Sequence, residues 1–351
     1  MTLPKPGSVA AALSKWFGVA QRDLPWRRTR DPYAIWVSEV MLQQTRVDTV
    51  QRYWDAFLVR FPTVERLAAA PESDVLEAWS GLGYYRRARL LHKGAKYVVQ
   101  TLDGKLPHEP KGLLAVPGIG KYTAGALTTI AFDQPAALVD GNVARVLSRI
   151  DAVVDPAEQP AAANRHWPRV AAIVAAGQPR VIAQALMELG ATVCTPRSPR
   201  CGECPLRRQC RARANDLVAT IPAPKKRAPS PEQDLWALAI TWRGKLGLVQ
   251  RPPEGLLAGL WCLPLVPRAE LPAPTAAALS ELLGVAIKTA KATDSGVKHV
   301  FTHRVWHLQP VCATATHKPP ALPGGDAAWT PLGTRPPGGI PAVTEKLLAA
   351  L

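Results

Sequence analysis

The sequence has no uninterrupted apolar run of about 18 residues, the length a membrane-spanning helix needs. It also begins without the apolar core of a secretion signal. These two absences predict a cytosolic protein, in which the six cysteines are poor candidates for disulfides. Acidic residues are scarce too, with 27 Asp and Glu against 43 Lys and Arg. The resulting formal charge of +16 favours a polyanionic partner.

The first 220 residues or so are patterned as helices. Asp31 followed by Pro32 is typical of a helix start, as N-cap and first-turn proline. No convincing strand interrupts this region, so we expect an all-α unit. Apolar residues recur at helical spacing in these ranges: 9–20, 33–58, 64–69, 73–79, 86–102, 161–176 and 179–189.

The character of the chain changes at Ile221. A run rich in proline and charge follows, which cannot hold a helix and predicts a linker. Beyond it, residues 235–241 and 246–250 alternate like strands, and residues 300–308 are β-rich in type. Residues 271–274 and 318–341 are heavy in Pro and Gly and predict loops. With 351 residues and 47% hydrophobic content, the chain can form a second, smaller α and β domain.

Pro117, Gly118 and Gly120 form a Pro-Gly-x-Gly turn between two apolar helical runs. Glycine tolerates the positive φ angles of such a turn, so we expect a helical hairpin whose second helix offers free backbone N–H groups to a phosphate. Asp140 follows an apolar run and precedes a helical pattern, so it stands where an N-cap is expected. From this stretch alone, a DNA backbone clamp and an ordinary surface hairpin with a capping Asp both remain open.

Glu39 lies in the predicted helix 33–58, most of whose positions read as buried, together with Gln43 and Gln44. A carboxylate in such a helix is unusual.

Four of the cysteines fall within seventeen residues. Four thiols this close in a cytosolic chain point to a metal, with an inert group of cysteines as the alternative. Zinc usually takes two Cys-x-x-Cys pairs, whereas here only Cys201 and Cys204 are so paired, which favours a structural iron–sulfur cluster. The predicted ligands are Cys194, Cys201, Cys204 and Cys210.

Together these motifs resemble the helix-hairpin-helix DNA glycosylases of the endonuclease III superfamily and, more narrowly, their adenine DNA glycosylase (MutY) branch. The resemblance rests on the hairpin with Asp140, on the C-x6-C-x2-C-x5-C spacing and on four further motifs. Those motifs are Leu24-Pro25-Trp26-Arg27, Ser38-Glu39-Val40-Met41-Leu42-Gln43-Gln44-Thr45, Gly81-Leu82-Gly83-Tyr84-Tyr85 and Val139-Asp140-Gly141-Asn142-Val143.

The resemblance implies an all-α helix-hairpin-helix glycosylase domain with an iron–sulfur cluster loop, joined by a linker to a small α+β MutT-like (Nudix-like) domain. The catalytic region would span residues 1–221, with a six-helix module at about 28–137 and a cluster module from about 1–27 plus 138–221. The linker would be 222–233 and the lesion-recognition domain 234–351. The cofactor would be a [4Fe-4S] cluster.

By resemblance, the chain is a cytoplasmic, nucleoid-associated bacterial monomer without a membrane partner. It would hydrolyse the N-glycosidic bond of adenine paired with 8-oxoguanine or guanine in double-stranded DNA, in base excision repair. Glu39 matches the catalytic acid and Asp140 the carboxylate that supports the sugar cation. Tyr122 replaces the lysine of strand-cutting members, so hydrolysis without a lyase step is implied, and Tyr122 and Asn142 would position Asp140 and water.

Recognition residues are also carried over from the family. Gln44 and Tyr84 would probe beside the opposite guanine, whereas Tyr84 and Leu42 without the resemblance read as core residues. Trp26, Arg27 and Leu42 would form the adenine pocket, Gln184 and Glu188 would also face adenine, and Gly118 and Gly120 would hold the DNA backbone. Phe301, Thr302 and His303 align with the Phe-Ser-His loop that reads 8-oxoguanine, with threonine in place of the usual serine.

Three other functions compete with this interpretation. A non-catalytic lesion-binding protein would not need both Glu39 and Asp140, and a glycosylase that cuts the strand at oxidised pyrimidines conflicts with Tyr122. A nucleotide pyrophosphatase would need several carboxylates in the segment 276–281, which holds one, Glu281. A metal site at His299, His303 and His307 would require helical spacing in a stretch that favours loop and strand.

Overall fold

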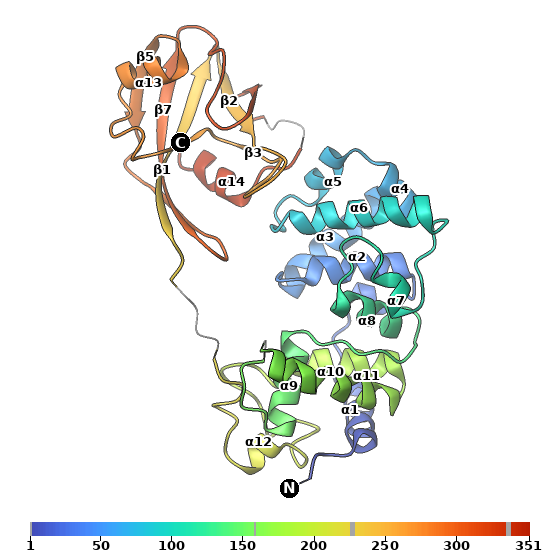
Figure 1. Ribbon diagram of the computed structural model, residues 1–351. Helices are drawn as coiled ribbons and strands as arrows, with labels where there is room; N and C mark the ends of the chain where they lie inside the picture. The colour runs from blue at the N-terminus through green and yellow to red at the C-terminus, as the bar shows by residue number, and fades with distance from the viewer. Residues whose placement is uncertain (1, 158, 225–228, 335–337) are drawn as a thin grey trace. The chain divides into compact units, whose positions relative to one another are not determined.

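The computed structural model describes residues 2–157, 159–224, 229–334 and 338–351. Contacts divide the chain into two units, one of residues 1–69 and 90–227 and the other of residues 70–89 and 228–351. Figure 1 shows helices throughout the first part of the chain and a sheet in the last part. No helix among these residues is both long and apolar enough to span a membrane.

The first unit consists of helices joined by short turns. Of the described residues before Glu232, none forms a strand, so the all-α prediction is confirmed. Its elements are α1 (Pro6–Ala20), η1 (Pro25–Arg27), α2 (Pro32–Leu42), α3 (Val47–Arg60), α4 (Val64–Ala69), α6 (Arg86–Thr101, which begins in the second unit), α7 (Pro110–Leu113), α8 (Lys121–Ile130), α9 (Gly141–Asp151), α10 (Pro160–Ala175), α11 (Pro179–Thr192) and α12 (Arg211–Ala214).

The prediction of one helix over residues 33–58 is wrong, because the chain breaks between α2 and α3. Gln43 ends α2 with an extended backbone, and Gln44 takes the left-handed conformation with φ of 59°. Gln44 is therefore exposed in a turn and does not lie on a helix. The indole Nε1 of Trp54 in α3 donates to the Ala34 carbonyl of α2 at 3.0 Å. Both helices bury apolar residues against each other, so the apolar period continued across the break.

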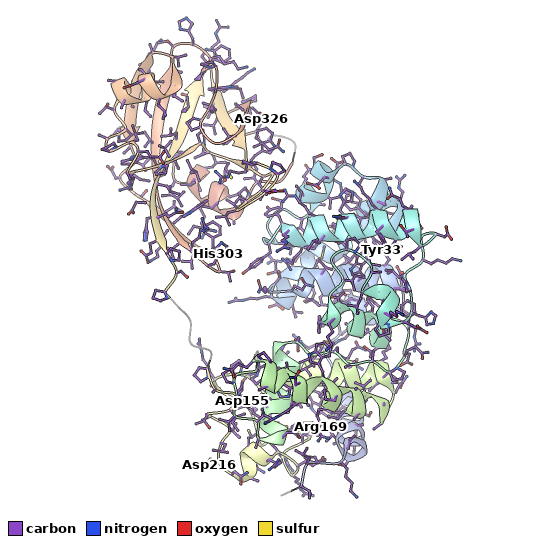
Figure 2. All side chains as sticks on the ribbon, viewed as in Figure 1. Tyr33, Asp155, Arg169, Asp216, His303 and Asp326 are labelled. Carbon is purple, nitrogen blue, oxygen red and sulfur yellow. The ribbon has the colours of Figure 1, made fainter. Side chains whose placement is uncertain are left out.

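Segments from both ends of the first unit pack side by side. Helix α1 contacts α10 and α11, although more than a hundred residues separate them in the chain (Figure 1). Arg169 of α10 ties these parts together, since it pairs with Asp151 at 2.9 Å and donates to the Pro4 carbonyl at 2.6 Å (Figure 2). The N-terminal helix thus packs against the helices that precede the cysteine loop.

The second unit is built on one mixed sheet in the order β3-β2-β1-β7-β5, with β4, β6 and β8 paired at its sides. Strands β1 and β7 run parallel, whereas the other pairs are antiparallel. The strands are β1 (Glu232–Trp242), β2 (Lys245–Gln250), β3 (Trp261–Cys262), β4 (Leu265–Pro267), β5 (Ile287–Ala292), β6 (Val297–Val300), β7 (Val305–Ala315) and β8 (Asp326–Pro331).

Two helices cover the two faces of this sheet, which the alternation of β1 explains. Leu238 and Ile240 face a core shared with Leu279 of α13 (Ala276–Leu283). Their neighbours Ala237 and Ala239 face a second core, shared with Leu347 of α14 (Ala342–Leu348). Successive strand residues point to opposite faces, so a strand buried on both sides reads as a continuous apolar run. The α+β prediction is confirmed.

The predicted loop over residues 318–341 is partly wrong, because β8 lies within it and pairs with β2 over six residues. Gly324 and Gly325 precede β8, Pro331 ends it, and residues 335–337 are outside the described ranges. The same holds for residues 225–228 of the predicted linker.

Residues 70–89 belong to the second unit, although about 140 residues separate them from the rest of that unit in the chain. They contain α5 (Glu72–Ala78) and the turn that leads into α6. The hydroxyls of Tyr85 and Ser80 donate to the Ile340 carbonyl at 2.9 and 3.2 Å, and the Arg89 guanidinium donates to the Ala258 carbonyl.

Candidate active site

The Pro-Gly-x-Gly turn forms the helical hairpin that the sequence predicts, between α7 and α8. Gly118 takes φ of 85°, and a Cβ added there would stand 2.8 Å from the Leu90 Cβ of α6. Any side chain at this position would therefore clash. Gly120 is the N-cap of α8 and has open space around its Cβ position. The first turn of α8, which carries Tyr122, starts at this glycine.

The segment before Asp140 runs close against α8, the helix that carries Tyr122. A Cβ on Gly125 would lie 1.8 Å from the Ala137 carbonyl oxygen, so only glycine lets residues 136–139 run against this helix. Asp140 then caps α9, accepting from the Val143 backbone N–H at 2.7 Å. The Asn142 amide adds a second donor at 3.1 Å. The N-cap prediction for Asp140 is confirmed.

Glu39 is buried in α2, with 5% of its surface exposed. Its Oε2 accepts a hydrogen bond from the Tyr122 hydroxyl at 2.8 Å. The pKa of Glu39 is raised to about 7, because burial and the charge of Asp140 outweigh the Tyr122 hydrogen bond and the Arg27 charge, which lower it. Glu39 is thus a carboxyl group that can hold a proton near neutral pH.

Asp140 has a different environment. Burial raises the pKa of Asp140 above its ordinary value, and the Val143 and Asn142 hydrogen bonds and the Arg145 charge offset only part of that rise. Hydrogen bonds from two donors favour the ionised form of a carboxyl group. Asp140 accepts more hydrogen bonds than Glu39, and such a difference between two carboxyl groups is the usual basis for separate acid and anion roles. That Asp140 stays ionised remains a prediction.

A chain of hydrogen bonds leads from Asp140 to the cysteines. The Asn142 Oδ1 accepts from Arg145 Nη2 at 2.8 Å. Arg145 also donates to the carbonyls of Cys194 and Gly190, both at 2.7 Å. A Cβ on Gly190 would lie 2.6 Å from the Asn142 Cβ, so this glycine lets α11 approach α9 closely. Sequence reasoning missed Arg145 and Gly190; the one available signal was that Arg145 follows Asn142 by three residues on one helix face.

The four predicted cysteine ligands line one pocket, together with Arg149, Leu189 and Leu206. The Arg149 Nη1 lies 3.4 Å from the Cys194 Sγ and 2.7 Å from the Thr195 carbonyl. The pKa of Cys204 is raised to about 12, mainly by burial and in part by the charges of Cys194, Cys210 and Cys201. All four cysteines are half-buried around this pocket, and thiolate sulfur is the donor that iron–sulfur clusters take. These residues therefore fit a thiolate-ligated metal centre.

The predicted base-pocket residues fall on three elements of the first unit. Trp26 and Arg27 form η1, Leu42 ends α2, and Gln184 lies buried in α11, where its amide donates to the Arg180 carbonyl at 3.1 Å. Glu188 does not have a free carboxylate. Its two oxygens accept hydrogen bonds from Arg22 and Arg27 at 2.8 Å. Burial raises the pKa of Glu188, but the two arginines outweigh burial and lower this pKa to about 2. Glu188 therefore orients the arginines.

The second unit brings two of the predicted recognition residues together. The Tyr84 hydroxyl lies 3.3 Å from the Thr302 Oγ1. Tyr84 is 50% exposed and takes φ of 48°, so its interpretation as a core residue is wrong. Leu42, the other residue so read, is half-buried. Phe301 packs on Trp306 with ring centres 4.8 Å apart. Thr302 and His303 are exposed on the loop between β6 and β7, and Figure 2 labels His303. His307 pairs with Glu232 at 2.8 Å.

Three family models match the chain. Residues 37–169 match the HhH-GPD superfamily of base excision DNA repair proteins, and residues 235–350 match the NUDIX domain. Residues 194–210, which contain all four cysteines, match the iron–sulfur binding domain of endonuclease III. These matches confirm the predicted glycosylase fold with a Nudix-like domain and the predicted iron–sulfur cluster.

Curated relatives and solved structures agree with the family models. The human adenine DNA glycosylase is 38% identical over 73% of this chain and 57% of its own length. The Arabidopsis thaliana protein of the same name is 38% identical, over 74% of this chain and 47% of that relative. The chain thus spans about half the length of these two relatives. The Mycolicibacterium smegmatis adenine DNA glycosylase is 46% identical over 59% of this chain and 70% of its own length.

Two solved structures support the helical fold. A thermostable thymine-DNA glycosylase aligns with a TM-score of 0.55 and 29% identity, over 60% of this chain and 97% of its own. A trapped endonuclease III–DNA covalent intermediate aligns with a TM-score of 0.51 over 60% of this chain and 95% of its own, and at 22% identity it shows the fold alone.

Proposed function

This chain belongs to the adenine DNA glycosylase family, and we propose that it hydrolyses the N-glycosidic bond of adenine mispaired with 8-oxoguanine or guanine in double-stranded DNA. The observation that carries this proposal is the buried pair of Glu39 and Tyr122 beside the capped Asp140. Hydrolysis of a glycosidic bond needs an acid for the leaving group and an anion near the sugar cation, and these residues supply both.

The proposed reaction starts with adenine turned out of the duplex, since the bond is not accessible in the stack. Protonated Glu39 donates its proton to the N7 of adenine, the bond from N9 to the sugar C1′ breaks, and adenine leaves as a neutral base. The carboxylate of Asp140 stabilises the positive charge left on the sugar. Water adds to C1′ and loses its proton to ionised Glu39, which restores the acid and leaves an abasic site.

We propose that the reaction stops at this product without cutting the strand. A strand-cutting glycosylase uses an amine that forms an imine with the sugar, and a phenol cannot do so. The residue at the relevant position is Tyr122, whose hydroxyl is held by Glu39. Breaks should therefore appear only after alkali has cleaved the abasic site.

The other predicted residues would bind DNA and select the mispair. The α8 start at Gly120 and the charge of +16 suit the DNA backbone. Trp26, Arg27, Leu42 and Gln184 would hold adenine, while Gln44, Tyr84 and the loop of Phe301, Thr302 and His303 would contact the opposite 8-oxoguanine. Cys194, Cys201, Cys204 and Cys210 would hold a [4Fe-4S] cluster, which supplies a rigid cross-link for the loop that carries them.

A single-turnover assay on a duplex with one adenine opposite 8-oxoguanine tests the proposal. Free adenine and strand breaks are measured with and without alkali, for the wild type and for Glu39→Gln, Asp140→Asn and the exposed control Glu65→Gln. We expect adenine release that needs alkali to reveal breaks, loss of release in the first two variants, and no change in the control. No release by the folded, iron-loaded wild type would overturn the proposal and leave a lesion-binding protein or a glycosylase for another base.

A further inference from the structure

The Tyr122 hydroxyl has two acceptors within hydrogen-bonding distance. One is the Glu39 Oε2 at 2.8 Å, and the other is the thioether Sδ of Met187 at 3.2 Å. Met187 is half-buried in α11, three residues after Gln184, and lies between buried neighbours on that helix. The Met187 sulfur and the Glu39 carboxyl group thus both lie within hydrogen-bonding distance of the same Tyr122 hydroxyl.

A hydroxyl carries one proton, so it can donate fully to only one of these acceptors. When Glu39 is ionised, its carboxylate is much the stronger acceptor and takes the bond. When Glu39 is protonated, that advantage is lost, and the thioether becomes a competing partner for the Tyr122 proton. A leucine in this place would offer no partner, and the hydroxyl would then have to donate to Glu39 in both states.

We propose that Met187 is a positioning residue. Its sulfur accepts the hydrogen bond of the Tyr122 hydroxyl while Glu39 is protonated, and this favours the protonated form of Glu39, which donates to the base. The inference deepens the proposed function and rests on it. Met187 acts through Tyr122, since its sulfur contacts the phenol. Burial and the neighbouring carboxylates raise the pKa of Tyr122 well above its ordinary value, so Tyr122 remains a donor throughout.

The other charged groups that face Glu39 make no bond to Met187, so replacing Met187 does not shift the Glu39 protonation equilibrium through them. Asp140 opposes the ionisation of Glu39 and Arg27 favours it. Asp140 is held by Val143 and Asn142, and Arg27 by Glu188, and none of these bonds involves Met187. Replacing Met187 therefore leaves these bonds in place and removes one partner of the Tyr122 hydroxyl.

The test is the pH dependence of single-turnover adenine excision by the iron-loaded full chain, from about pH 5 to about pH 9. It compares the wild type with Met187→Leu, which keeps the volume but removes the acceptor, and with Met187→Gln, whose amide oxygen restores one. For Met187→Leu we expect the alkaline fall in rate to move down by about 0.5 to 1 pH unit, the size of one weak neutral hydrogen bond.

On the acid plateau the Met187→Leu rate should stay within about twofold of the wild type, and on the alkaline side it should drop about three- to tenfold. Met187→Gln should return the fall toward the wild-type position. A purely structural role for Met187 would lower the rate equally at all pH values. That result, or a leucine variant with an unmoved profile, would refute the inference.

A second readout needs no DNA. The infrared carbonyl band of the protonated Glu39, assigned by its loss in Glu39→Gln, should titrate at lower pH in Met187→Leu than in the wild type. If the wild type releases no adenine, the proposed function fails in the first assay, while this band still tests the hydrogen bond. An identical band titration in the two proteins would overturn the inference on its own.

Discussion

Replacing Glu39 by glutamine should make the protein more stable at neutral and alkaline pH while abolishing its proposed reaction. Burial moves the pKa of Glu39 from 4.5 to about 7 in the folded protein. A carboxyl group with a raised folded pKa contributes its full stability below the unfolded pKa and loses it as the pH rises through the folded value. In the wild type, therefore, the free energy of unfolding should fall between pH 4.5 and about 7 because of this one group.

The size of the effect follows from that shift. A change of one pKa unit corresponds to about 1.4 kcal/mol, so a shift from 4.5 to about 7 costs the wild type roughly 3 kcal/mol above neutral pH. Glutamine has the same shape, cannot ionise, and still offers an oxygen to the Tyr122 hydroxyl. We expect the Glu39→Gln variant to match the wild type near pH 4.5 and to be about 2 to 3 kcal/mol more stable near pH 8.

The assay is urea unfolding of the iron-loaded proteins, followed by far-ultraviolet circular dichroism at several pH values. With two units in the chain, the shift in midpoint between variants is compared at equal slope. Glu188→Gln is the matched control with the opposite sign, because Arg22 and Arg27 lower the pKa of Glu188 to about 2. That variant should lose stability at neutral pH. A Glu39→Gln protein that is less stable than the wild type at pH 8, or a difference that does not change with pH, would refute the reasoning.

Three further results are expected. Arg145→Met should lower the free energy of unfolding by about 2 to 4 kcal/mol and should also lower the iron content per chain, because the Cys194 and Gly190 carbonyls lose their hydrogen-bond donor. Full iron loading, measured by metal analysis, would contradict this. Gly190→Ala should slow single-turnover excision at least about tenfold, because the added Cβ would stand 2.6 Å from the Asn142 Cβ. Gly202→Ala is the control and should keep the wild-type rate, since the space around Gly202 is open. Equal rates for the two variants would argue against a role for Asn142. Thr302→Ala should narrow the preference for 8-oxoguanine over guanine, and unchanged relative rates on the two duplexes would count against the loop assignment.

Local patterns in the sequence predicted the parts of the site that local chemistry determines. The Asp140 cap and the Gly118 turn depend on a few neighbouring residues, so their residue types are sufficient signals. The burial of Glu39 followed from the apolar helix around it. The grouping of the four cysteines followed from their spacing.

Features that depend on contacts between distant segments could not be predicted in this way. Arg145 and Met187 matter because α11 lies against α9 and α8, and no single-sequence pattern records that packing. The break at Gln44 was hidden because α2 and α3 bury apolar residues on both sides of it. Strand β8 was missed because its partner β2 lies about eighty residues away.

The most direct test of the central claim is the single-turnover rate of adenine excision as a function of pH, measured for the wild type. If protonated Glu39 is the acid, the rate should be level below about pH 7 and then fall about tenfold per pH unit, following its pKa of about 7. A rate that stays constant through this range, or a fall that persists unchanged in a residual reaction of Glu39→Gln, would contradict the assignment of Glu39 as the proton donor.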